Sequence, residues 1–182
     1  MLKKQKQILT DALDLYGRVS VNSNYPREKL WGWTAPHMKR YWDKIEEGLE
    51  ALLFYAQEEP HIAYNHKIYS QPFGFVVEDM IACLKKQGLD LVNLPKNIQE
   101  SELTSPKIKF QDQGRTLSTD FLYRLAIVQS INSQVKIPKL KTVLEIGAGL
   151  GTLARCLKLF NPKLKYYIID LPETLVFSYC FL

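Results

Sequence analysis

Two acidic residues and three glycines near the carboxyl end of the chain have the spacing of a ligand-binding loop. In the stretch VLEIGAGLGTLA, an acid is followed by glycines at alternate positions: Glu145, then Gly147, Gly149 and Gly151. Glycine is needed where a chain turns sharply after a strand and approaches a ligand closely, because a Cβ atom would collide there. A second acid, Asp170, ends the next apolar run, where its carboxylate can accept hydrogen bonds from ribose hydroxyls. These residues predict a site for a nucleoside-containing ligand.

The elements that must position these residues form a predicted strand–helix–strand unit. KTVLEIGAG is a short β-branched apolar run that ends in glycines, which is typical of a buried parallel strand. LGTLARCLKLF predicts a helix that Asn161 and Pro162 break, and KYYIID predicts a second strand. PETLVFSYCFL opens a further helix, with Pro172 in its first turn. A dinucleotide fingerprint would need a small residue where Thr152 stands, which disfavours a nucleotide-dependent oxidoreductase.

The same motifs carry a family resemblance. VLEIGAGLGTLA followed by YYIIDLPETL resembles the first two motifs of class I S-adenosylmethionine-dependent methyltransferases, and IIDLPETLVFSYCFL resembles a family of sugar O-methyltransferases. The specific part of the resemblance covers residues 141–182. It implies S-adenosylmethionine as cofactor and a sugar, or another small hydroxylated molecule, as methyl acceptor.

The resemblance also implies roles for individual residues. The glycines 147, 149 and 151 would pass under the methionine part of the cofactor, and Glu145 would help to hold that end. Asp170 would bind the ribose, and Leu171 would lie against the adenine.

Each of these residues also has a plainer structural explanation. Gly147 and Gly151 could serve only helix–strand packing, and Glu145 could cap neighbouring amides. Asp170 could cap the helix that begins near Pro172. The plain explanation suits any one residue, but all of them together favour the cofactor.

Residues 1–140 show helical periodicity interrupted by loops. The apolar spacing predicts a helix that stops at Gly17, with Leu13 among its inward-facing residues. It further predicts helices over residues 34–60, 75–88 and from Ser118 or Thr119 onward, and an irregular connector over 94–115.

The expected fold class is therefore α/β, with two regions. Residues 1–140 form a helical cap, dimerisation or acceptor region, and residues 141–182 form the first βαβ unit of a Rossmann-like methyltransferase sheet. Two strands are too few for an independent sheet. From the resemblance, we expect the chain to be truncated after the second strand of a methyltransferase domain.

Methyl transfer to a hydroxyl is an in-line displacement, for which a protein supplies positioning and a general base. His37 and His66 are the candidate bases in this chain, although each histidine is better explained as a surface or structural residue. No metal site is expected, since the spacing of His61 and His66 does not align two imidazoles on one helical face.

Composition limits the partners. The net charge of +5 is spread along the chain, which disfavours nucleic-acid binding. No signal peptide or membrane span is predicted, so we expect a cytoplasmic protein, with a possible homodimer through the helical region. The alternative function is a non-enzymatic helical interaction or dimerisation module that keeps a remnant of the cofactor-binding unit.

Overall fold

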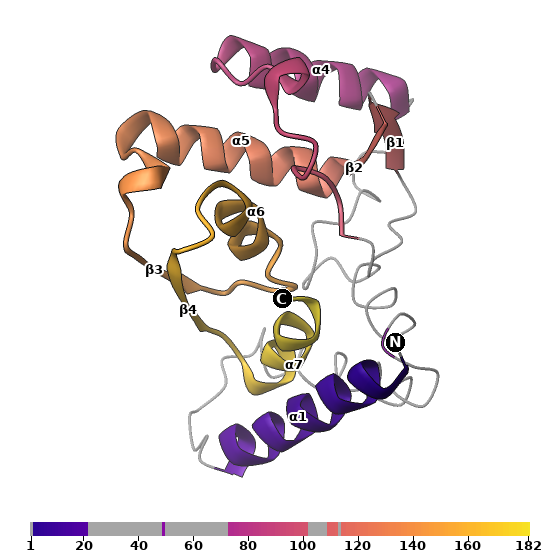
Figure 1. The fold of residues 1–182 in the computed structure, drawn as a ribbon, viewed down its shortest axis with the longest axis vertical. Coiled ribbons are helices and arrows are strands. Elements are labelled where there is room, and N and C mark those ends of the chain that lie inside the picture. Colours follow the sequence, from indigo (N-terminus) through magenta and orange to yellow (C-terminus); the bar gives the residue numbers. More distant parts are fainter. Residues whose placement is uncertain (1, 22–48, 50–72, 102–108, 113) are drawn as a thin grey trace, which may run out of the picture.

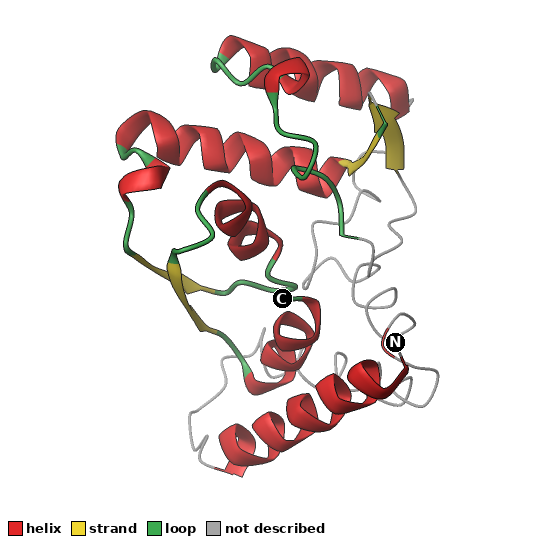
Figure 2. Cartoon of the chain, in the orientation of Figure 1, coloured by secondary structure: helices red, strands yellow, loops and turns green. Residues whose placement is uncertain are grey.

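A computed structural model of the chain describes residues 2–21, 49, 73–101, 109–112 and 114–182. The described part is α/β, with helices predominating and two small two-stranded sheets (Figures 1 and 2). Its helices are α1 (Leu2–Val21), α4 (Phe73–Lys86), α5 (Thr119–Gln134), α6 (Thr152–Phe160) and α7 (Pro172–Phe181), with short 3₁₀ turns η3 (Leu91–Asn93) and η4 (Ile137–Lys139). Its strands are β1 (Lys109–Asp112), β2 (Arg115–Ser118), β3 (Thr142–Ile146) and β4 (Lys165–Ile169).

The strands β3 and β4 run parallel and are joined through α6, as the sequence predicts. Leu144 lies opposite Tyr167, and Ile146 lies opposite Ile169. The helix between them ends at Phe160, where the Asn161 side chain donates hydrogen bonds to the carbonyls of Ile137 (3.0 Å) and Leu140 (2.9 Å). These two bonds fix the segment that leads into β3.

The helix α5 is the centre of the hydrophobic core. It packs against α4 on one side and α6 on the other (Figure 1). Ser118 caps its N-terminus by accepting a hydrogen bond from the Phe121 amide at 3.1 Å, which confirms the predicted start. Buried leucines from α4, α5 and α6 belong to one cluster, so residues before and after position 140 share a core.

Two predicted elements are wrong. The connector predicted over 94–115 contains β1 and the start of β2, which pair antiparallel around Gly114, a residue with φ of 79° that suits a tight turn. The first helix does not stop at Gly17 but continues to Val21. One glycine costs a helix only about 1 kcal/mol, and α1 gains contacts along α7.

One prediction of burial in the N-terminal region is wrong, and one predicted helix lies almost entirely outside the described residues. Leu13 of α1, expected to face inward, is 39% exposed. The helix predicted over 34–60 lies outside the described residues except for Leu49, which is helical and buried. Among the helices that are described, none is both long and apolar enough to cross a membrane.

The outer face of β3 and β4 is apolar and exposed, although apolar runs of this kind are typical of buried parallel strands. It carries Leu144, Ile146, Tyr167 and Ile169, whose exposed fractions run from 54% to 78%. The opposite face, with Val143 and Tyr166, packs against the core cluster. Parallel sheets are normally covered on both faces, but the described helices cover only one face of this strand pair. We call the exposed side the outer face.

The core and the outer face make a matched test of this arrangement. Leu125→Ala, at a fully buried position of α5, should lower the free energy of unfolding by about 2–5 kcal/mol, because it leaves a cavity. Leu144→Ala makes the same chemical change at a position 59% exposed, and should alter stability by no more than about 0.5 kcal/mol. Urea unfolding of both variants measures the difference, and equal losses would contradict the placement of β3.

Candidate functional site

The glycine loop lies where β3 and β4 both end. The Gly147 amide donates a hydrogen bond to the carbonyl of Ile169 at 2.8 Å, which extends the parallel ladder by one residue. Gly147, Gly149 and Gly151 have φ angles of 75°, 59° and 89°. Residues that carry a side chain rarely adopt these left-handed backbone angles. The alternating glycines therefore allow the loop to fold back over the strand ends.

Asp170 joins the loop to the end of β4. One of its carboxylate oxygens accepts a hydrogen bond from the Gly149 amide at 2.9 Å, and the other accepts from the Leu171 amide at 2.8 Å. The helix α7 begins after Leu171 without a side-chain cap. The plain explanation of Asp170 as the cap of this helix is therefore wrong, and its carboxylate instead holds the loop.

Burial raises the pKa of Asp170 above its usual value, while the hydrogen bonds from the amides of Gly149, Leu171 and Ala148 oppose that shift. A carboxylate can accept about four hydrogen bonds in all. Asp170 therefore keeps acceptor capacity for a further donor, such as a ribose hydroxyl.

Glu145 bonds to a side chain that the sequence analysis did not single out. The Tyr166 hydroxyl of β4 donates a hydrogen bond to the Glu145 carboxylate at 2.9 Å. Burial raises the pKa of Glu145, and this hydrogen bond and the positive charge of Arg124 on α5 partly counter the shift. The strand register brings the two side chains together, since Glu145 lies opposite Ile168, two residues beyond Tyr166. Pairing the two predicted strands would have revealed this contact.

The glycines differ in the space around them. Gly147 is exposed, and a Cβ atom added there would meet no atom within 4 Å. At Gly151 an added Cβ would lie 3.1 Å from the end of the Leu182 side chain, which would have to shift slightly, and the φ of 89° by itself favours glycine. The carbonyl of Gly149 accepts a hydrogen bond from the Ser178 hydroxyl of α7 at 2.6 Å. A ligand can therefore approach the loop at Gly147, while α7 and the chain end pack against its other side.

The loop also leads into a helix start that suits an anion. The helix α6 follows Gly151 and has neither a side-chain cap nor an acidic residue in its first turn. Helix N-termini present amide donors and a partial positive charge. Leu171, the residue predicted to contact adenine, is half-buried next to Asp170.

The structure thus brings together all six residues predicted to hold the cofactor: Glu145, Gly147, Gly149, Gly151, Asp170 and Leu171. The candidate bases His37 and His66 lie outside the described residues. Within the described ranges, no group of three or more His, Cys, Asp or Glu side chains could hold a metal ion.

Replacing the Asp170 carboxylate by an amide tests its hold on the loop. Asp170→Asn keeps the size of the side chain but replaces one accepting oxygen with a donor, so one backbone amide loses its partner. We expect the free energy of unfolding to fall by about 1 kcal/mol or more. Asp79→Asn, the same change at an exposed position of α4, is the control and should stay within about 0.5 kcal/mol of the parent chain. If chemical denaturation gives both variants the same stability, the Asp170 tether does not support the loop.

Comparisons with known proteins identify no relative of this chain. Searches against models of protein families, curated proteins and solved structures give no match. The described part of the chain is α/β, mostly helical, with a small parallel strand pair.

Proposed function

We propose that the chain is an S-adenosylmethionine-dependent methyltransferase that acts on a hydroxyl group of a sugar or another small molecule. In this proposal β3, α6 and β4 are the first βαβ unit of a Rossmann-like sheet. One observation carries the proposal: the Asp170 carboxylate, at the end of β4, is hydrogen-bonded to the Gly149 amide of the loop that follows β3. The bond joins an acid and a glycine loop at the same edge of a parallel strand pair. This is the edge at which α/β folds bind nucleotides, and it supports the proposal that Asp170 binds a ribose.

Each part of the cofactor has a plausible partner at this edge. The ribose hydroxyls would donate to Asp170, which retains acceptor capacity, and the adenine would lie against the half-buried Leu171. The methionine part would cross the open space over Gly147, towards Glu145.

The cofactor would supply a sulfonium methyl group, and the acceptor hydroxyl would form the new bond to carbon as the carbon–sulfur bond breaks. The work of the protein in such a displacement is to hold the two reactants in line and to accept the hydroxyl proton. The residues at the loop serve the first task. For the second task, His37 and His66 stay predictions from the sequence.

Comparing Gly147→Ala with a control glycine distinguishes the loss of a ligand contact from the effect of backbone strain. The added methyl group meets no protein atom but would project into the space proposed for the cofactor. Gly114→Ala is a matched control, because Gly114 has a similar φ of 79° and equally open surroundings in the β1–β2 turn. Each change should cost about 1–2 kcal/mol of stability. We expect calorimetric titration with S-adenosylmethionine to show affinity at least about tenfold weaker for Gly147→Ala, and unchanged for Gly114→Ala.

Asp170→Ala should abolish the binding, since it removes both the loop tether and the ribose acceptor. Two results would contradict the proposal: no S-adenosylmethionine binding by the parent chain, or equal binding by the parent and Gly147→Ala. The first result would favour the alternative of a non-enzymatic helical module. The second would mean that S-adenosylmethionine binds elsewhere than over Gly147.

A further inference from the structure

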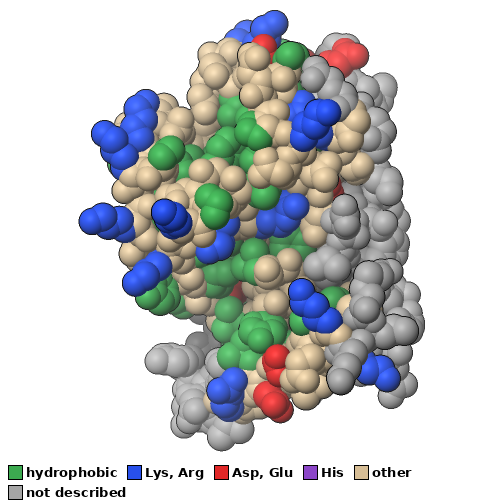
Figure 3. All heavy atoms as spheres, in the orientation of Figure 1, with side chains coloured by type: hydrophobic (Ala, Val, Ile, Leu, Met, Phe, Trp, Pro, Cys, Tyr) green, Lys and Arg blue, Asp and Glu red, His purple; other side chains and the backbone are tan. Residues whose placement is uncertain are grey.

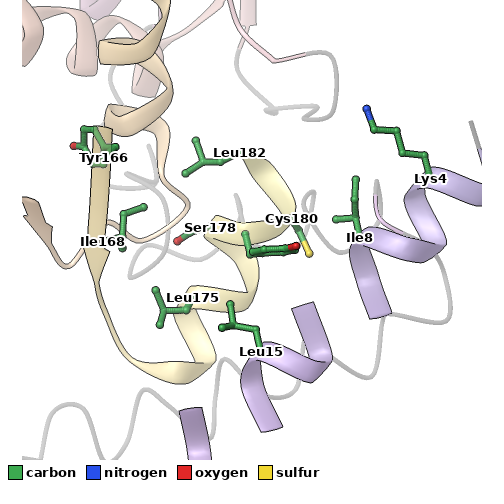
Figure 4. A pocket seen from close by; sticks show the side chains of 10 residues that line it. Lys4, Ile8, Leu15, Tyr166, Ile168, Leu175, Ser178, Cys180 and Leu182 are labelled. Carbon is green, nitrogen blue, oxygen red and sulfur yellow. The ribbon is translucent and has the colours of Figure 1, made fainter. Parts of the chain in front are cut away.

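A cavity of about 600 Å³ lies between α1, β4 and α7. Figure 4 shows α7 between β4 and α1, with the side chain of Leu15 pointing from α1 towards α7. The cavity volume is within the range of small-molecule pockets, and the cavity is widely open to solvent. None of the residues proposed to hold the cofactor lines this cavity, so it is a separate site.

The cavity wall is mostly apolar. Its aliphatic side chains come from all three elements: Ile8, Leu15, Ile168, Leu175 and Leu182. Tyr166, Ser178 and Tyr179 also line it. The hydroxyls of Tyr166 and Ser178 donate to Glu145 and to the carbonyl of Gly149, and Tyr179 is 44% exposed. Burial raises the pKa of the Cys180 thiol to about 12, which keeps it uncharged. The wall therefore suits an alkyl chain better than a polar molecule.

Among the described residues that line the cavity, Lys4 is the cationic one. It lies one helical turn before Ile8 on α1, and its side chain is exposed. Lys4 and Leu15 are separated by roughly 16 Å along the helix axis. A positive charge thus stands near one end of an extended apolar wall, where an anionic head can stay in water while its chain is buried.

We propose that this cavity binds a fatty-acid-like anion, with a single unbranched alkyl chain against α7 and β4 and the carboxylate beside Lys4. The apolar wall provides the affinity through burial of the chain. The ammonium of Lys4 selects an anionic head over an uncharged one. The site goes beyond the proposed methyl transfer and does not depend on it.

Calorimetric titration of the full chain with dodecanoate, below its micelle concentration, tests the proposal. We expect saturable binding of one dodecanoate per chain. Lys4→Gln should weaken dodecanoate binding about threefold to fivefold, as expected for an exposed ion pair. Lys6→Gln, which removes an exposed charge of the same helix outside the lining, should leave it unchanged. Binding of dodecan-1-ol should be the same in all three proteins.

Two variants fill the cavity from opposite walls, so that one of them can fail to fold without ending the test. Ile8→Trp on α1 and Ile168→Trp on β4 should each reduce dodecanoate affinity at least tenfold in a chain that still melts cooperatively. The proposal is overturned if the parent chain binds no dodecanoate in a saturable manner. It is also overturned if a folded, filled variant binds as the parent does, or if Lys4→Gln changes nothing.

Discussion

The hydrogen bond between the Asp170 carboxylate and the Gly149 amide is the constraint on which the site depends. The loop after β3 and the end of β4 are also joined by the last rung of the strand ladder, at Gly147, and by the hydrogen bond from the Ala148 amide to the same carboxylate. The carboxylate bears a cost of burial, seen in its raised pKa, that amide donors partly offset. Ligand-binding sites often contain a partly buried acid at the end of a strand, held by hydrogen bonds from backbone amides.

The helix α7 and the residue that follows it pack against the glycine loop. The Ser178 hydroxyl bonds to the carbonyl of Gly149, and Leu182 packs against Gly151, so the loop lies between Asp170 and this helix. Exposed hydrophobic side chains are visible over the α7 region in Figure 3, which draws basic side chains dispersed over the same face. Because Ser178 and Leu182 also line the apolar cavity, a molecule bound there would contact the residues that support the loop. The two proposed sites thus share a wall while using different residues.

The C-terminal elements could be predicted from sequence because their signals are local. Apolar β-branched runs, alternating glycines and Pro172 mark strand, loop and helix within a few residues. The β1–β2 hairpin was missed because its two strands are short and lack clear alternation. The helix α1 passes Gly17 because its packing on α7, a contact distant in sequence, outweighs one glycine. The Tyr166–Glu145 bond follows only after β3 and β4 are paired in register, and the outer face depends on which elements cover the strands. The hydrophobic pattern of each segment by itself contains neither piece of information.

The central claim is that the loop and the end of β4 form one ligand-binding edge. Amide hydrogen–deuterium exchange of the full chain, with and without S-adenosylmethionine, tests it most directly. The account predicts that peptides covering residues 145–151 and 166–171 become protected together, while α4 exchanges at an unchanged rate. Protection of neither segment, or of only one of them, would contradict the claim that Asp170 and the glycine loop act as one site.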